Sequence, residues 1–212
     1  MHLTFFGHSC LLIEENGARL MVDPGFWSEG HTEISGLDAI FITHEHPDHC
    51  DIESLSRLRE HNQNFRIYTN KGVGKKLAGA DFSFELLENG ASMTVKGLSV
   101  EAFGQDHAVI YQSFPRFDNT GFLFDGRLFH PGDALNVYPD KPVEILALPV
   151  IAPWMRMADS LEYAKKIKPQ LVFPIHDGML KHVGPFHSIP KDVLGAEGMR
   201  FVVLEKGLRT EF

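Results

Sequence analysis

Short apolar runs separated by turn residues are the main pattern along this chain. Such runs are typical of β-strands, and an Asn-Gly or Asp-Gly pair between two of them is typical of a hairpin turn. Asn16-Gly17, Lys96-Gly97 and Asp125-Gly126 each lie between two apolar runs and therefore indicate hairpins. The strands that we predict cover residues 3–6, 10–14, 19–23, 37–43, 66–69, 92–95, 98–103, 121–124, 127–130, 144–148, 171–174 and 201–204.

Helical periodicity is visible in fewer segments. Apolar residues recur at helical spacing within residues 52–61, which predicts a helix with one apolar face. Residues 158–167 predict a second amphipathic helix, and a shorter helical stretch lies near Val193. Because strands and helices alternate in two halves of similar style, we predict an α/β (α+β) fold. A length of 212 residues without a linker predicts one domain over residues 1–212.

Composition narrows the classes of partner. A formal net charge of −8 opposes a broad basic face, so we expect a small-molecule substrate and no nucleic acid. No apolar run reaches the roughly 18 residues of a membrane span, and the first residues lack the pattern of a signal peptide. Two cysteines are too few for a disulfide framework. We therefore expect a cytoplasmic protein without a membrane span, and a homo-oligomer is left open.

The most informative stretch is His44-Glu45-His46-Pro47-Asp48-His49, which directly follows the predicted strand 37–43. His44 and His46 can face one ion from an extended segment, while Asp48 and His49 can face a second ion beyond it. Imidazole and carboxylate are ordinary ligands of divalent metals, and α/β folds place chemistry where strands end. The stretch therefore predicts part of a metal site.

One loop cannot enclose two metals, so further ligands must follow other strands. Three residues qualify, because each lies just past the end of a predicted strand: His107, Asp133 and His176. Asp106 lies beside His107 and competes with it for the role of ligand.

The His-x-His-x-Asp-His motif, followed in order by a histidine, a Gly-Asp pair and a last histidine, resembles the metallo-β-lactamase superfamily. The segments Gly7-His8-Ser9-Cys10 and Met21-Val22-Asp23-Pro24 resemble the branch that contains ascorbate-6-phosphate lactonase and N-acyl phosphatidylethanolamine phospholipase D. This resemblance covers nearly the whole chain and implies a four-layer αββα sandwich. It also implies that one metal is held by His44, His46 and His107, a second by Asp48, His49 and His176, and that Asp133 bridges them.

Two divalent ions on this ligand set would retain a formal charge of about +2, which would deprotonate a bridging water. The resulting hydroxide predicts hydrolysis of a small, anionic ester, lactone, amide or phosphate ester. Zinc is the metal that we expect, with manganese or iron as alternatives. Residues expected to act in the reaction are Asp48, Asp133 and His8. The group that protonates the leaving group is left open among metal-bound water, Asp48, His8, His182 and His187.

Several neighbouring residues have two interpretations. Asp23 is expected to orient a ligand or loop backbone. His130 points either into the groove or away from it. Cys50 follows His49 and is interpreted as a small buried residue rather than a thiolate ligand. Residues 154–157, which include a tryptophan and two methionines, form a substrate wall, part of the core or a subunit contact.

The chain departs from its resemblance at two places. Ala134 stands where relatives usually have threonine, and residues 149–152 read Pro-Val-Ile-Ala in place of Pro-Ile-Gly-Gly, which weakens the inheritance of a sugar-lactone activity. An iron-dependent oxidoreductase or dioxygenase is the first alternative function, although the retained His46 and the lack of a flavin-binding region favour hydrolysis. A non-catalytic metal-binding sensor is the second, although all seven expected ligands are present.

Overall fold

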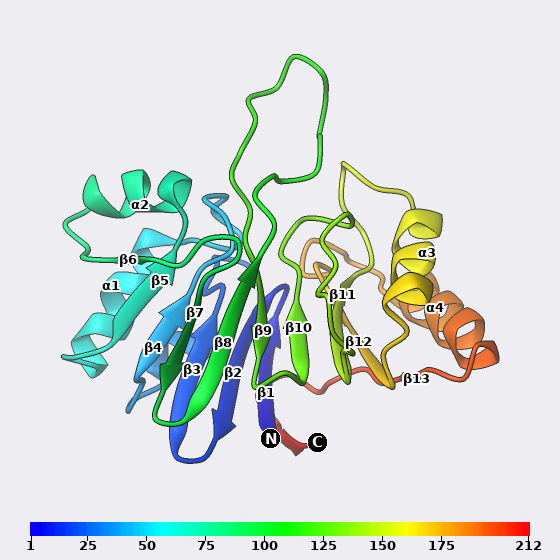
Figure 1. The fold of residues 1–212 in the computed structure, drawn as a ribbon, viewed down its shortest axis with the longest axis horizontal. Coiled ribbons are helices and arrows are strands. Elements are labelled where there is room, and N and C mark those ends of the chain that lie inside the picture. Colours follow the sequence, from blue (N-terminus) through cyan, green and yellow to red (C-terminus); the bar gives the residue numbers. More distant parts are fainter.

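The computed structural model describes residues 1–212 and contains two seven-stranded sheets packed face to face (Figure 1). The first sheet has the strand order β14 (Arg209–Glu211), β1 (His2–Gly7), β2 (Cys10–Glu15), β3 (Ala18–Val22), β4 (Ala39–Phe41), β5 (Arg66–Thr69) and β6 (Glu85–Leu86). The second has the order β13 (Arg200–Phe201), β12 (Leu171–Ile175), β11 (Ile145–Pro149), β10 (Leu128–His130), β9 (Gly121–Phe124), β8 (Leu98–Phe103) and β7 (Ser92–Val95).

Each sheet combines an antiparallel part with a parallel part. Strands β1 to β3 and β7 to β10 pair antiparallel, and short turns join them except between β8 and β9; β3 to β6 and β10 to β13 pair parallel. Parallel neighbours need long crossovers, and helices supply several of them. These helices are α1 (Ile52–His61), α2 (Lys71–Ala78), α3 (Met157–Ile167) and α4 (Gly184–Ala196); a short 3₁₀ helix, η1, covers His31–Glu33.

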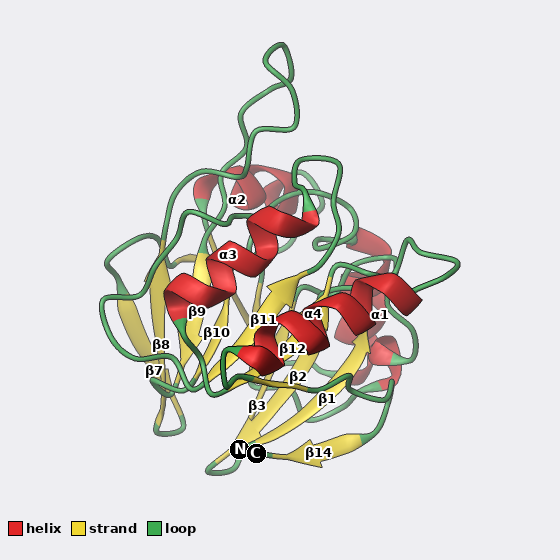
Figure 2. Ribbon diagram, turned by 90° about the vertical axis from the view of Figure 1, so that its right-hand side faces the viewer, coloured by secondary structure: helices red, strands yellow, loops and turns green.

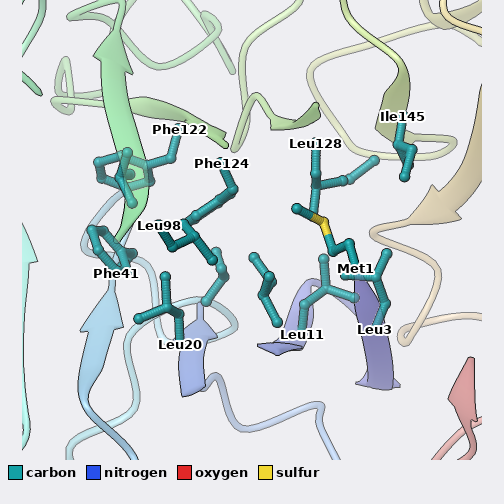
Figure 3. Close-up of a cluster of buried hydrophobic side chains, with 14 of the residues drawn as sticks. Met1, Leu3, Leu11, Leu20, Phe41, Leu98, Phe122, Phe124, Leu128 and Ile145 are labelled. Carbon is teal, nitrogen blue, oxygen red and sulfur yellow. The ribbon is translucent and has the colours of Figure 1, made fainter. Parts of the chain in front are cut away.

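Helices cover the outer face of each sheet, so the central strands are buried on both sides, whereas the edge strands β6, β7 and β14 are more exposed. Along β2, Leu11 and Ile13 point into the core between the sheets, while Cys10 and Leu12 point toward α1 and α2. In the second sheet Leu123 points away from the inter-sheet core, into the cluster beneath α3 and α4. Figure 3 shows the inter-sheet core, and Figure 2 shows α3 and α4 in front of the second sheet. The predicted four-layer αββα sandwich is therefore confirmed.

The sequence missed some elements. Helix α2 contains Gly72 and Gly74, which disfavour helix, but Asn70 caps it by accepting a hydrogen bond from the Val73 N–H at 3.1 Å. Helix α4 contains the predicted helical stretch near Val193 and is longer than expected. It runs for 13 residues despite an internal proline. At the end of the chain β13 ends at Phe201, and the short strand β14 pairs with β1.

The connection between β8 and β9 is a long loop that rises above both sheets (Figures 1 and 2). It begins after Phe103 and ends before Gly121, and its two limbs meet at the bridge between Asp106 and Asp118. Among the helices, none has the length and apolar character required to cross a membrane. The long loop matters because its base carries one of the predicted ligands.

Candidate metal centre

All seven predicted ligands meet at one edge of the two sheets. His44, His46, Asp48 and His49 follow β4, while His107 follows β8, Asp133 follows β10 and His176 follows β12 directly. Their ligand atoms form two groups, each with atoms within 4.8 Å of one another: His44, His46, His107 and Asp133 in the first, and His8, Asp48, His49 and His176 in the second. The structure thus adds His8 to the seven residues.

Asp133 lies between the two groups. Its Oδ1 is 3.2 Å from His49 Nε2, and its Oδ2 is 3.0 Å from His176 Nε2 and 3.4 Å from His107 Nε2. A single carboxylate therefore reaches imidazoles of both groups.

Several of these atoms are buried without a hydrogen-bond partner. They are Nε2 of His44, His49, His107 and His176, and Oδ1 of Asp133. Leaving buried polar atoms unpaired costs free energy, and native proteins avoid it. Nitrogen and oxygen atoms that converge in this way fit divalent metal ions, which would pair with all of them.

Hydrogen bonds at the opposite ring nitrogen fix the protonation of three imidazoles. Nδ1 lies 2.7 Å from Asp23 Oδ2 in His49, 2.6 Å from the Ala108 carbonyl in His107, and 2.7 Å from the Ile151 carbonyl in His176. These oxygens can only accept, so each Nδ1 carries the proton. In the neutral form of each ring, the inward Nε2 then has the free lone pair that a metal ligand requires.

Asp23 organises the loop behind the ligands. Its Oδ1 accepts the Thr43 N–H at 2.8 Å, and its Oδ2 accepts the Thr43 hydroxyl at 2.8 Å. Because that hydroxyl donates to Asp23, it accepts from Nδ1 of His44 at 3.0 Å. One buried carboxylate therefore orients both His44 and His49.

His8 differs from the other members of its group. The Gly178 N–H donates to its Nδ1 at 3.2 Å, so its Nε2 carries the proton and donates to Asp48 Oδ2 at 3.0 Å. Burial lowers the pKa of His8 to about 4, so the ring is neutral at pH 7. We therefore assign His8 as a hydrogen-bond donor that orients Asp48 rather than as a metal ligand.

The electrostatics of the groups favour a cation. Burial would raise the pKa values of Asp133 and Asp48, but His176 and His49 beside Asp133, and the hydrogen bond from His8 to Asp48, hold both well below their usual range. Burial lowers the pKa of His46 to about 4. At pH 7 both carboxylates are thus charged while His46 keeps a free lone pair.

His49 and His176 shift in the opposite direction. Burial disfavours their charged forms, but the neighbouring Asp133 outweighs it and raises both pKa values. The same negative charge that would hold a proton on these rings would hold a divalent cation there.

Two supporting residues carried no sequence motif. Asn119, at the base of the long loop, accepts the Asp133 N–H at 2.9 Å and donates to the Pro131 carbonyl at 2.9 Å. Lys76, on α2, donates to the carbonyls of Glu45 at 2.8 Å and Cys50 at 2.6 Å. Both reach across long sequence separations, so spacing along the chain could not reveal them.

Glycine 25 allows the ligand loop to approach the preceding segment. A Cβ at this position would lie 1.7 Å from the Asp48 carbonyl oxygen, which no side chain tolerates. The loop therefore packs against bare backbone.

The structure distinguishes between the alternative roles of four residues that the sequence left open. His130 is buried and points away from the ligands, with Nε2 3.1 Å from the Ser9 carbonyl. Cys50 is buried and belongs to neither ligand group. His187 pairs with Asp177 at 2.7 Å and His182 is exposed, so neither contacts the ligands.

The structure also shows where residues 154–157, the candidate substrate wall, and Ala134 lie. The indole N–H of Trp154 donates to Asp133 Oδ2 at 3.1 Å, so this residue contacts the centre directly. Met155 is half-buried, and Met157 begins α3. Ala134 packs into the core beneath α3 and α4.

Comparison with known proteins matches this arrangement. A family model described as "Beta-lactamase superfamily domain" matches residues 2–176. The chain belongs to the metallo-β-lactamase superfamily. Protein Rv0786c of Mycobacterium tuberculosis is 39% identical over 185 residues, covering 85% of each chain.

Other relatives within the superfamily are more distant. A UPF0173 metal-dependent hydrolase of Salinibacter ruber is 28% identical over 199 residues, covering 83% of this chain and 84% of its own. Igni18, a metallo hydrolase from Ignicoccus hospitalis, shares the fold with a TM-score of 0.76 and 21% identity, covering 100% of this chain and 98% of its own.

Proposed function

We propose that this protein is a metal-dependent hydrolase with a dinuclear site that cleaves an ester, lactone or phosphodiester bond. The observation that carries the proposal is the convergence of buried, unpaired imidazole nitrogens on Asp133 from two groups. Relatives within the superfamily are named metal-dependent hydrolases, which agrees with it.

The ligands of the proposed site follow from the two groups. One metal would be held by His44, His46 and His107, the other by Asp48, His49 and His176, with Asp133 shared between them. Zinc is the metal that we propose, because these donors are nitrogen and carboxylate oxygen; manganese and iron accept the same donors. Bound divalent ions supply Lewis acidity and lower the pKa of water from about 15.7 to about 7.

Residues of the chain have further roles in the proposed reaction. Asp48 receives the His8 N–H on Oδ2, which fixes the orientation of the carboxylate beside His49 and His176. The lowered pKa of Asp48 keeps this carboxylate charged at pH 7, so it has no proton to donate. The formal charge of the loaded site, about +2, favours either an anionic substrate or the oxyanion that forms during attack on a neutral one.

The test combines metal analysis with turnover. Protein stripped of metal is titrated with zinc, manganese and iron(II), bound metal is counted, and lactones and phosphodiesters are assayed with each sample. We expect two metals per chain and turnover that returns with them. Binding of no metal under any condition would overturn the proposal.

Two variants make the test specific. Asp133→Ala should reduce binding of both ions, because both groups lose the same carboxylate. Asp106→Ala removes the exposed carboxylate next to His107 and should leave both ions bound. Full occupancy in Asp133→Ala would contradict the shared position of this residue.

Narrower expectations stay predictions. These are the resemblance to the lactonase and phospholipase D branch, one domain over residues 1–212, a cytoplasmic location and the oligomeric state.

A further inference from the structure

Aromatic side chains contact the metal centre from three different segments. Phe117 lies with its ring centroid 4.5 Å from that of His46, and Trp27 lies 4.9 Å from that of His8. Trp154 reaches the middle of the centre through its hydrogen bond to Asp133. Both ligand groups are therefore bordered by aromatic rings, none of which is a metal ligand.

Further apolar side chains extend this border toward solvent. Phe26 stacks obliquely on Trp27 at 4.8 Å and is 49% exposed. The long loop above the sheets (Figure 1) leaves the centre at His107 and returns to it at Phe117. Between these two residues it exposes Val109, Tyr111 and Phe114, and the loop after His176 exposes Met179. Exposed apolar side chains on segments that border a centre are available to bind an apolar ligand.

Cations that would hold an anionic substrate are absent from the inner part of this border. No lysine or arginine forms an ion pair with Asp48 or Asp133, and Lys76 is committed to two loop carbonyls. Arg156 pairs with Asp159. Arg116, next to Phe117, and Lys181, two positions after Met179, are exposed and form no ion pair, so they are the free cations of these two loops.

The N-terminus of α2 is also unavailable to an anion. The N-terminal N–H groups of α2 are taken by protein oxygens: Gly72 donates to Asp118 at 2.9 Å and Lys71 donates to Glu88 at 3.1 Å. Recognition of a phosphate or carboxylate normally uses an arginine fork or a free helix N-terminus.

We propose that the mouth of the metal centre binds an uncharged, apolar group, so that the substrate is an ester or lactone bearing an alkyl chain or an aromatic ring. This group would lie against Trp27, Phe117 and Trp154. The identity of the scissile bond rests on the function proposed above, whereas the apolar binding surface stands on the aromatic contacts alone. The residual positive charge of the loaded site then acts on the oxyanion formed during attack.

Turnover tests the substrate class with lactones that differ only in one substituent. γ-Butyrolactones bearing hydrogen, hexyl or carboxylate at the γ carbon are hydrolysed by the metal-loaded protein and followed by pH-stat. We expect the hexyl compound to have a kcat/KM at least about tenfold above the unsubstituted one, mostly through KM. A preference for the carboxylate compound would overturn the proposal.

Variants locate the effect. Phe117→Ala should lower kcat/KM for the hexyl lactone by a larger factor than for the unsubstituted lactone, so that most of the preference for the hexyl group is lost. Leu208→Ala is the matched control, because Leu208 is 52% exposed but lies next to β14, away from the centre. An equal preference in wild type and Phe117→Ala would overturn the role of the aromatic border.

A binding measurement keeps the proposal independent of turnover. N-phenyl-1-naphthylamine is neutral and fluoresces in apolar sites, and Trp27 and Trp154 are the two tryptophans of the chain. We expect energy transfer from tryptophan to this dye in metal-free protein. The hexyl lactone should displace the dye, whereas the carboxylate lactone should not. In Phe117→Ala we expect weaker energy transfer. Dye binding without turnover of any lactone would refute hydrolysis of lactones yet support the apolar surface; no energy transfer would overturn it.

Discussion

His46 and His49 lie three positions apart in one loop, yet they are held in different ways. His49 is fully buried, and its Nδ1 is fixed by Asp23 at 2.7 Å. His46 is half-buried, forms no hydrogen bond through its ring, and lies against Phe117 at the base of the long loop. Hydrogen bonds to rigid strand ends hold one ligand, and an aromatic contact borders the other. We therefore expect the second group to bind its ion more tightly than the first.

Removal of the hydrogen bond between Asp23 and His49 should have the largest effect on metal affinity and stability. Asp23→Asn keeps a residue that tolerates the observed φ of 46° but replaces an acceptor of two hydrogen bonds with an amide nitrogen. We expect metal affinity of the second group to fall by about 10- to 100-fold and the metal-free protein to lose about 3 kcal/mol of unfolding free energy. Metal titration and urea unfolding measure the two effects.

The control for Asp23→Asn is Asp192→Asn, an exposed position on α4. It should change neither quantity. Equal metal affinity in Asp23→Asn and wild type would show that this carboxylate does not orient His49.

The support of Asp48 by His8 should have the next largest effect. His8→Ala removes the donor to Asp48 Oδ2, whereas His8→Gln can place an amide N–H near the same oxygen. We expect His8→Ala to weaken the metal of the second group by about tenfold and His8→Gln to recover part of that loss. If instead His8→Ala lost the metal altogether and glutamine gave no recovery, His8 would be a ligand.

A buried histidine outside the centre can be compared with the ligand histidines. His31 is 3% exposed, both of its ring nitrogens lack a partner, and burial lowers its pKa to about 4. The unfolded chain takes up a proton near pH 6.5 that the folded chain refuses until about pH 4. His31 therefore costs stability progressively as the pH falls through this window, by up to about 3 kcal/mol.

The measurement is urea unfolding of metal-free protein at pH 7 and pH 5. Relative to wild type, His31→Leu should lose less stability between these two values, and the difference isolates this one ring from the ligand histidines. An unchanged pH dependence in His31→Leu would mean that the buried ring does not resist protonation.

Substitution of Cys50, which follows His49, should have the smallest effect on metal content and stability. Cys50 is buried, and burial raises the pKa of its thiol to about 12, so no thiolate is present at pH 7. Cys50→Ser should leave the metal content unchanged and lower stability modestly, by about 1 kcal/mol. Loss of one metal ion in this variant, counted by elemental analysis, would make the thiol a ligand.

Much of the centre was predictable because its signals are local. A His-x-His-x-Asp-His spacing and three residues just past strand ends can be recognised without knowledge of the fold, and short apolar runs between turn residues indicated most strands. Helix α2 and strand β14 were missed for a physical reason. The glycines of α2 oppose helix formation, and the exposed Arg209–Glu211 segment becomes a strand by pairing with β1, near the opposite end of the chain.

The sequence by itself determined which residues can bind metal, because ligand chemistry is a property of the side chain and its spacing. Only the tertiary structure decided how each one is used. The free lone pairs of His49 and His176 depend on Asp23 and on the Ile151 carbonyl, and the donor role of His8 depends on Gly178, which lies 170 positions away. Hydrogen bonds between distant segments set the proton on each ring, and these contacts exist only in the folded chain.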